Sequence, residues 1–197
     1  AQEILTKEFG EGLNMELLKR QDRLTGILNG VDYAEWRTQG NPHLAAEYDV
    51  DNLSGKATCK KHLLKIFGLP DEGLPLLAVV SRLAEQKGIG QMVEALTELL
   101  PDNRFQFVLL GSGDEALEEM LLQLRAEFPN RVGVEIGYDQ SLSHKIEAGA
   151  DFFLMPSRFE PGGLNQLYSL RSGIYPIVHA VGGLKDTITD VSQAKGN

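Results

Sequence analysis

Two patterns of hydrophobic residues alternate along the chain from about residue 75 onward. Five short apolar runs have the composition of strands buried on both faces, at 76–80, 105–110, 131–136, 152–155 and 176–179. Between these runs, apolar residues recur at helical spacing, as at Ile89, Met92, Val93 and Leu96. This spacing predicts helices over about 89–100, 117–124, 141–149 and 163–171.

Strands that alternate with helices predict an α/β fold, a doubly wound parallel sheet of the Rossmann-like kind. Ligands of such sheets bind beyond the carboxyl ends of the strands. We therefore take as candidate site segments the loops 81–88, 111–114, 137–141, 156–164 and 180–186.

The first 70 residues are less regular. The stretch 26–32 has the pattern of a strand and a turn entering the domain, and 53–67 predicts an amphipathic helix that ends at Gly68. Four lysines on that helix favour a solvated face, namely Lys56, Lys60, Lys61 and Lys65.

Composition narrows the class of protein. The 197 residues suffice for one domain or slightly more, and 42% hydrophobic with 24% charged residues is ordinary globular usage. The single cysteine, Cys59, excludes a disulfide framework within the chain. A net charge of −9 argues against a nucleic-acid partner, and no apolar run is long enough to predict a membrane span.

The segment 111–116 reads Gly-Ser-Gly-Asp-Glu-Ala and fits the dinucleotide pattern G-x-G-x-x-A, with Glu135 further along the chain. Three interpretations stay open here. Asp114 could simply cap a helix after a tight turn, the turn could line a nucleotide pocket, or the chain could be an NAD-dependent oxidoreductase domain that uses Glu135. The NAD pattern belongs on the first strand of a sheet, and an earlier strand precedes this one.

Charged residues in two other loops suit a phosphorylated ligand. Arg82 and Lys87 follow the first strand, where they could hold a phosphate or simply face solvent. Glu160 precedes Gly162 and Gly163, which open a helix, and a helix start attracts anions. The carboxylate of Glu160 could therefore accept hydrogen bonds from sugar hydroxyls, face developing positive charge, or cap the helix.

A second glycine pair, Gly182 and Gly183, opens another helix after the last strand. It could add amides to the same anion site or form a plain turn.

Together these segments resemble the carboxy-terminal half of bacterial glycogen synthases and plant starch synthases, which are family 5 retaining glycosyltransferases of the two-domain GT-B type. Order and spacing carry the resemblance over nearly the whole chain, in the segments 27–32, 81–88, 136–138, 156–161, 163–168 and 179–187.

The resemblance implies specific roles. Arg82 and Lys87 look like the pair that holds the donor diphosphate, Tyr138 like the aromatic that stacks on adenine, and Glu160 like the carboxylate that orients the transferred glucose. Further substrate-binding positions are implied at Gly111, Gly162, Gly163, Leu164, Asn165, Gly182 and Gly183.

The sequence also departs from the family pattern. Gly162 stands where the family typically has Cys, and Tyr168 replaces the second Glu of the broader E-x7-E pattern, as is usual among these synthases.

The resemblance further implies a domain organisation: an interdomain segment over 1–24 and a Rossmann-like donor-binding domain over 25–197, incomplete at its carboxyl end. The family's amino-terminal domain, which carries the acceptor groove and a catalytic histidine, is not in this chain. We therefore expect a fragment that is inactive alone, in the cytoplasm of a bacterium or a plant plastid.

The implied reaction transfers glucose from ADP-glucose to the 4-hydroxyl of an α-1,4-glucan with retention, without a cofactor or metal. The sequence leaves open whether a covalent intermediate forms or attack is front-side. Two alternatives remain: the NAD-dependent oxidoreductase domain, and a non-catalytic nucleotide-sugar-binding module.

Overall fold

A five-stranded parallel sheet organises the computed structural model, which describes residues 3–193. The strands lie in the order β3-β2-β1-β4-β5, and every neighbouring pair is parallel. Their bounds are β1 Leu76–Val80, β2 Gln106–Gly111, β3 Val132–Ile136, β4 Phe152–Met155 and β5 Tyr175–Val178. The topology confirms the predicted doubly wound α/β fold, and each strand lies within one residue of its predicted position.

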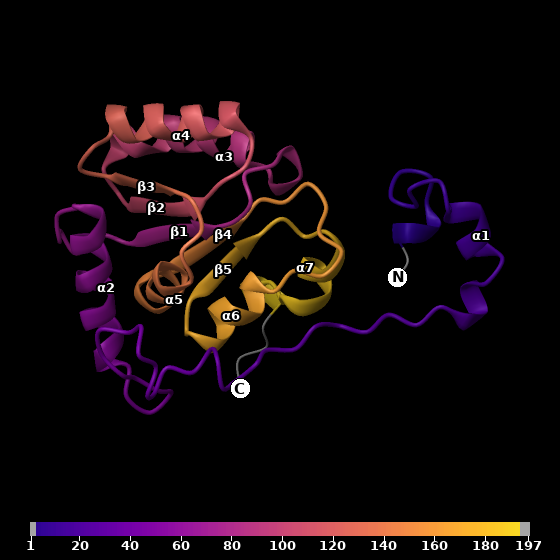
Figure 1. The fold of residues 1–197 in the computed structure, drawn as a ribbon, viewed down its shortest axis with the longest axis horizontal. Helices are drawn as coiled ribbons and strands as arrows, with labels where there is room; N and C mark the ends of the chain where they lie inside the picture. Colours follow the sequence, from indigo (N-terminus) through magenta and orange to yellow (C-terminus); the bar gives the residue numbers. More distant parts are fainter. Residues whose placement is uncertain (1–2, 194–197) are drawn as a thin grey trace.

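Helices cover both faces of the sheet (Figure 1). Helices α3 and α4 connect β1 to β2 and β2 to β3 on one face, while α5 takes the chain back across the other face to β4. The helix bounds are α2 Ser54–Phe67, α3 Ile89–Leu99, α4 Glu115–Glu127, α5 Gln140–Gly149, α6 Asn165–Arg171 and α7 Gly182–Thr187.

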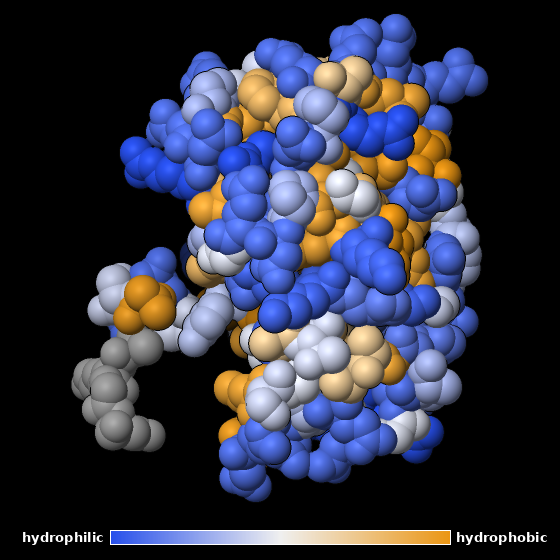
Figure 2. Space-filling view, turned by 90° about the vertical axis from the view of Figure 1, so that its left-hand side faces the viewer, coloured by the Kyte–Doolittle hydropathy of each residue, from blue (hydrophilic) through white to orange (hydrophobic). Residues whose placement is uncertain are grey.

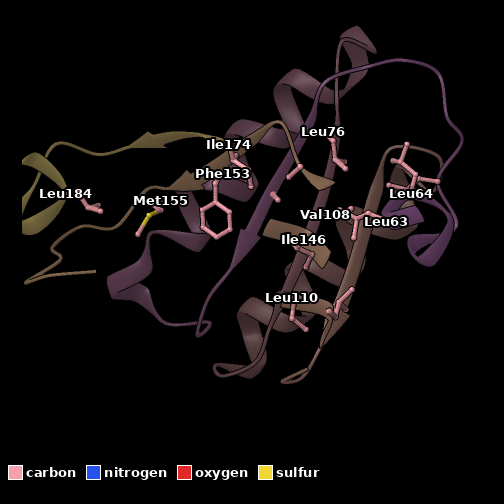
Figure 3. Packing of buried hydrophobic residues seen from close by; sticks show 14 residues of the cluster. Leu63, Leu64, Leu76, Val108, Leu110, Ile146, Phe153, Met155, Ile174 and Leu184 are labelled. Atoms are coloured by element: carbon pink, nitrogen blue, oxygen red, sulfur yellow. The ribbon is translucent and has the colours of Figure 1, made fainter. Parts of the chain in front are cut away.

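Two apolar clusters hold the layers together, one on each face. Leu76, Val108 and Phe153 point from the sheet toward Leu63 and Ile146 of the helices α2 and α5 (Figure 3). On the opposite face, side chains of α3 and α4 pack on apolar residues of β1, β2 and β3. All six residues of β2 are buried, which explains why the central strands read as continuous apolar runs.

Local signals set the ends of several helices. The Asp114 carboxylate accepts from the backbone amides of Ala116 and Leu117 at the start of α4, and Asp139 caps α5 through the amide of Leu142. Gly68 ends α2 in the left-handed conformation at φ 69°, as predicted.

The amino-terminal segment lies beside the loops of the sheet rather than within it. It holds a 3-10 turn over Glu3–Leu5, the short helix α1 over Asn14–Leu18 and a second 3-10 turn over Gln21–Arg23. The Oε1 atom of Glu3 accepts a hydrogen bond from the amide of Gly182 at 2.9 Å, and the Phe9 ring lies 6.0 Å from that of Phe159. The division into 1–24 and 25–197 stays a prediction, and residues 1–2 and 194–197 lie outside the described range.

The prediction of a strand over 26–32 is wrong. These residues run as an extended stretch that pairs with no strand, and Ile27 is 90% exposed (Figure 1). An apolar pair between glycines resembles a strand locally, but a strand also needs a neighbouring backbone.

The expectation of a solvated lysine face on α2 is correct for only half of the lysines. Lys61 and Lys65 are exposed, and Figure 2 looks onto this side of the molecule, where hydrophilic residues cover much of the surface. Lys60 instead forms an ion pair with Asp151 at 2.6 Å, and Lys56 donates to the carbonyls of Ala148 and Ser172. Within residues 3–193 the structure contains no helix with the length and apolar character to cross a bilayer.

Candidate functional site

One cavity of about 450 Å³ opens at the carboxyl ends of β1, β2, β3 and β4. Parallel strands bring the loops that follow them to one edge of a sheet, so this is where the fold gathers them. Eight of the predicted site residues line the cavity: Arg82, Lys87, Gly111, Tyr138, Glu160, Gly163, Leu164 and Asn165.

An ion pair stands in the cavity wall. The Nζ atom of Lys87, at the end of a 3-10 turn after β1, lies 2.5 Å from Oε2 of Glu160 in the loop after β4. The Ser157 hydroxyl donates to the same oxygen at 3.3 Å. The Glu160 side chain is 8% exposed and that of Lys87 20%, so water screens this pair weakly.

Backbone contacts hold these two loops together. The amide of Arg158 donates to the carbonyl of Gln86 at 2.8 Å, and the Gln86 side chain returns a hydrogen bond to the carbonyl of Phe159 at 3.1 Å. Asn165, in the first turn of α6, donates from Nδ2 to the carbonyl of Val80 at 2.5 Å. The Lys87–Glu160 pair is therefore fixed by its backbones as well as by its charges.

Two lining residues face open space. Arg82 is exposed where β1 ends, and Tyr138 is 87% exposed after β3. Both side chains are free to rearrange around a ligand, the guanidinium toward an anion and the phenol ring toward a planar group.

Three predicted residues lie outside the lining of this cavity: Gly162, Gly182 and Gly183. The amide of Gly183 donates to the carbonyl of Glu160 at 2.8 Å, and the amide of Gly182 donates to Glu3. In this structure the second glycine pair supports the Glu160 loop from behind, and its contact with a ligand stays a prediction.

The 111–116 turn has the capping role that the sequence suggested, and it also lines the cavity; that this cavity holds a nucleotide stays a prediction. Asp114 caps α4, and Gly111 and Ser112 line the cavity. Gly113 pairs with Leu83, and a Cβ at Gly113 would lie 2.2 Å from the Leu83 carbonyl oxygen, so packing alone accounts for this glycine. Glu135, which an NAD site would need, lies outside the cavity lining.

The sequence analysis missed one wall of the cavity. Glu35 and Trp36 belong to a turn that is far from any strand along the sequence. In space they line the cavity together with Tyr168 of α6. The Trp36 ring stacks on the Tyr168 ring at 3.8 Å and 11°, and on the His144 ring at 4.3 Å and 29°. Trp36 is the single tryptophan of the chain, which was the available signal.

Burial shifts the pKa of two rings at this wall. It raises the pKa of Tyr168, and Glu35 adds to that shift. Burial lowers the pKa of His144, and the neighbouring His43 lowers it further, so the stack favours a neutral imidazole.

A second group of shifted residues lies away from the cavity, between α2, α5 and α6. Burial raises the pKa of Glu147 to about 8 and lowers that of Lys56 to about 8. Ser169 donates to the Glu147 carboxyl at 3.2 Å. These contacts join helices, and none of the three residues lines the cavity described above. Within the described part of the chain, no three His, Cys, Asp or Glu side chains gather as metal ligands would.

Comparisons with known proteins agree with this arrangement. Among solved structures, the catalytic domain of starch synthase IV from Arabidopsis thaliana, bound to ADP and acarbose, superposes with a TM-score of 0.92 at 35% identity. The match covers 100% of this chain and 41% of that one, and it confirms the sheet as that of a GT-B carboxy-terminal domain. HepE from Anabaena, solved with UDP and glucose, shares the fold at 17% identity and a TM-score of 0.65, covering 93% of this chain and 45% of that one.

Curated sequences match this chain at higher identity than the starch synthase IV structure does. The glycogen synthase of Myxococcus xanthus is 54% identical over 188 residues, which is 95% of this chain and 39% of that protein. That of Thioalkalivibrio sulfidiphilus is 50% identical over 195 residues, 98% of this chain and 40% of that protein. The chain thus spans about two fifths of the length of these relatives. A family model described as "Glycosyl transferases group 1" matches residues 63–195, so the chain belongs to that family, and within it the chain is similar to glycogen and starch synthases.

Proposed function

We propose that the chain is the donor-binding half of a retaining glucosyltransferase that moves glucose from ADP-glucose to the 4-hydroxyl of an α-1,4-glucan. The observation that carries the proposal is the cavity itself, in which Arg82, Lys87 and Glu160 meet at the carboxyl ends of the strands. The similarity to starch synthase IV, which was solved with ADP and acarbose, supports the choice of donor and acceptor.

The two cations suit the leaving group. Cleavage of the anomeric C–O bond places negative charge on the departing ADP, and donors already in position stabilise that charge without reorganising. One such donor lowers the barrier by about 3–4 kcal/mol. Lys87 has three N–H donors, so it can keep its bond to Glu160 while it donates to a phosphate oxygen.

Glu160 suits the sugar. One of its oxygens already accepts from Lys87 and Ser157, and the other is available to sugar hydroxyls or to the positive charge that develops on the glucose ring. Tyr138 offers an uncommitted ring face for adenine. In this proposal, the groove that binds the glucan acceptor belongs to a domain outside this chain.

Titration calorimetry with ADP tests the proposal. We expect the wild-type chain to bind ADP, and Arg82→Ala and Lys87→Ala each to weaken binding about tenfold or more, as for loss of a charge-assisted hydrogen bond. Unchanged affinity in both variants would refute the assignment of the diphosphate site.

A second assay addresses activity. ADP release from ADP-glucose in the presence of glycogen should be undetectable with this chain alone, with a full-length glycogen synthase as the positive control. Turnover by the isolated chain would contradict the proposal that it is only the donor half. Binding of NADH that Glu135→Ala abolishes would instead support the oxidoreductase alternative.

A further inference from the structure

Trp36 packs between α5 and α6, and together with Glu35 it forms a wall of the cavity. One face of the Trp36 ring is covered by Tyr168 and another by His144. With both faces occupied, the indole can present only its edge to the cavity. Stacking of a ligand on Trp36 is therefore excluded, and a charged contact at this wall must come from a neighbouring residue.

The neighbour that carries charge is Glu35. Its backbone is held by Asp32, whose Oδ1 atom accepts from the amides of Ala34 at 2.8 Å and Glu35 at 3.3 Å. Its side chain is held by Gln140 at the start of α5, which donates from Nε2 to Oε1 at 3.1 Å. A carboxylate has about four acceptor positions, so this contact orients Glu35 and leaves most of its acceptor capacity unused.

Charged side chains of opposite sign line the cavity from different segments of the chain, so each of these segments suits a different part of a nucleotide. Arg82 and Lys87 lie in the loop after β1, whereas Glu35 and Asp139 are anionic and line the cavity from the turn and from the α5 cap. A diphosphate is repelled by the second pair and attracted by the first. The part of the ligand that suits Glu35 is neutral and rich in hydrogen-bond donors.

We propose that Glu35 binds the ribose of the nucleotide donor by accepting hydrogen bonds from its 2′- and 3′-hydroxyls. A carboxylate is the side chain that accepts two adjacent hydroxyl donors best, and acidic residues serve ribose in this way in other α/β nucleotide sites. This inference rests on the proposed function, because it assumes that a nucleoside diphosphate occupies the cavity. It assigns a donor-affinity role to a residue that no strand-end motif contains.

Calorimetry with ADP and 2′-deoxy-ADP tests it in a double-mutant cycle. We expect wild type to bind ADP about tenfold more tightly than 2′-deoxy-ADP, the effect of a hydrogen bond to a charged group. Glu35→Ala should lower ADP affinity to a similar extent and abolish the preference for the hydroxyl. Glu98→Ala, which removes an exposed glutamate from the surface of α3, is the matched control and should bind both ligands as wild type does.

The outcomes separate the two proposals. If Arg82→Ala weakens ADP binding but Glu35→Ala leaves the affinity and the hydroxyl preference unchanged, this inference is wrong while the proposed function stands. If wild type does not bind ADP, both fall. A third ligand, inosine diphosphate, replaces the adenine amino group by a carbonyl. If Glu35→Ala changes the preference between ADP and inosine diphosphate rather than the hydroxyl preference, Glu35 contacts the base and the ribose assignment is overturned.

Discussion

Replacement of Lys87 by methionine tests how much the ion pair between Lys87 and Glu160 stabilises the fold. The substitution keeps most of the aliphatic stem and removes the ammonium that lies 2.5 Å from Glu160. Glu160 would retain only its weaker hydrogen bond from Ser157, at 3.3 Å, around a carboxylate that is 8% exposed. The variant therefore leaves a nearly buried charge without its counter-ion.

The size of the effect follows from that burial. At 2.5 Å and an effective dielectric constant of 20, the attraction is about 7 kcal/mol before desolvation is subtracted. Loss of one partner of a buried pair typically costs about 3–5 kcal/mol in unfolding free energy. For a chain of this length, we expect Lys87→Met to lower Tm by roughly 6–20 °C.

Urea denaturation followed by circular dichroism measures this loss of unfolding free energy. A double variant shows whether the loss comes from the unpaired charge of Glu160. Lys87→Met combined with Glu160→Gln removes both charges, so it should be more stable than Lys87→Met alone. The control is Lys19→Met, which breaks the Lys19–Glu16 pair where both side chains are 65% exposed and should cost at most about 1 kcal/mol. Equal costs for the buried and the exposed pair, or simple additivity in the double variant, would refute the reasoning.

Three further predictions concern packing, titration and binding. Gly88→Ala places a Cβ 2.1 Å from the carbonyl oxygen of Pro156 and should cost at least about 3 kcal/mol by urea denaturation. Gly73→Ala has a similar positive φ but open space, so it should cost only about 1–2 kcal/mol, and equal costs would contradict the clash. Burial raises the pKa of Glu147 from 4.5 to about 8, so between these values the folded state holds a proton that the unfolded chain has lost, and stability falls as pH rises. Glu147→Gln should remove that fall, up to about 4 kcal/mol between pH 5 and 8, and an equally steep fall in the variant would exclude Glu147 as its source. Tyr138→Ala should leave unfolding free energy within about 0.5 kcal/mol of wild type while weakening ADP binding about tenfold in calorimetry, and wild-type affinity would remove the ring from the proposed site.

The central strands β1 and β2 were predictable because most of their residues are buried. A strand of a parallel sheet is covered on both faces, so β2 is apolar from Phe107 to Leu110, and its polar side chain, Gln106, is itself buried. The gathering of the loops after β1 to β4 then follows from topology alone. The false strand at 26–32 shows the converse, since Ile27 and Leu28 are apolar but lie 90% and 55% exposed on a stretch without a partner.

The wall formed by Glu35 and Trp36 could not be predicted by the same rule. It reaches the cavity through long-range stacking, with Trp36 separated along the chain from His144 and Tyr168 by more than a hundred residues. No local periodicity encodes such a contact. The inward contacts of Lys56 and Lys60 on α2 could not be predicted for the same reason. Their partners lie in segments far along the chain, which the periodicity of α2 does not describe.

The glycines of the loops show what such motifs encode in this fold. A Cβ at Gly111 would lie 2.1 Å from the carbonyl oxygen of Ser81, and one at Gly182 would lie 2.0 Å from that of Glu160. In both cases the neighbour is the backbone of the adjacent loop, which cannot swing away as a side chain can. Glycine is thus required for one loop to press against the next and bring Arg82 and Glu160 to a common rim. A glycine-rich pattern in this chain consequently predicts where loops meet, whereas which amides remain free for an anion depends on contacts such as that between Gly183 and Glu160.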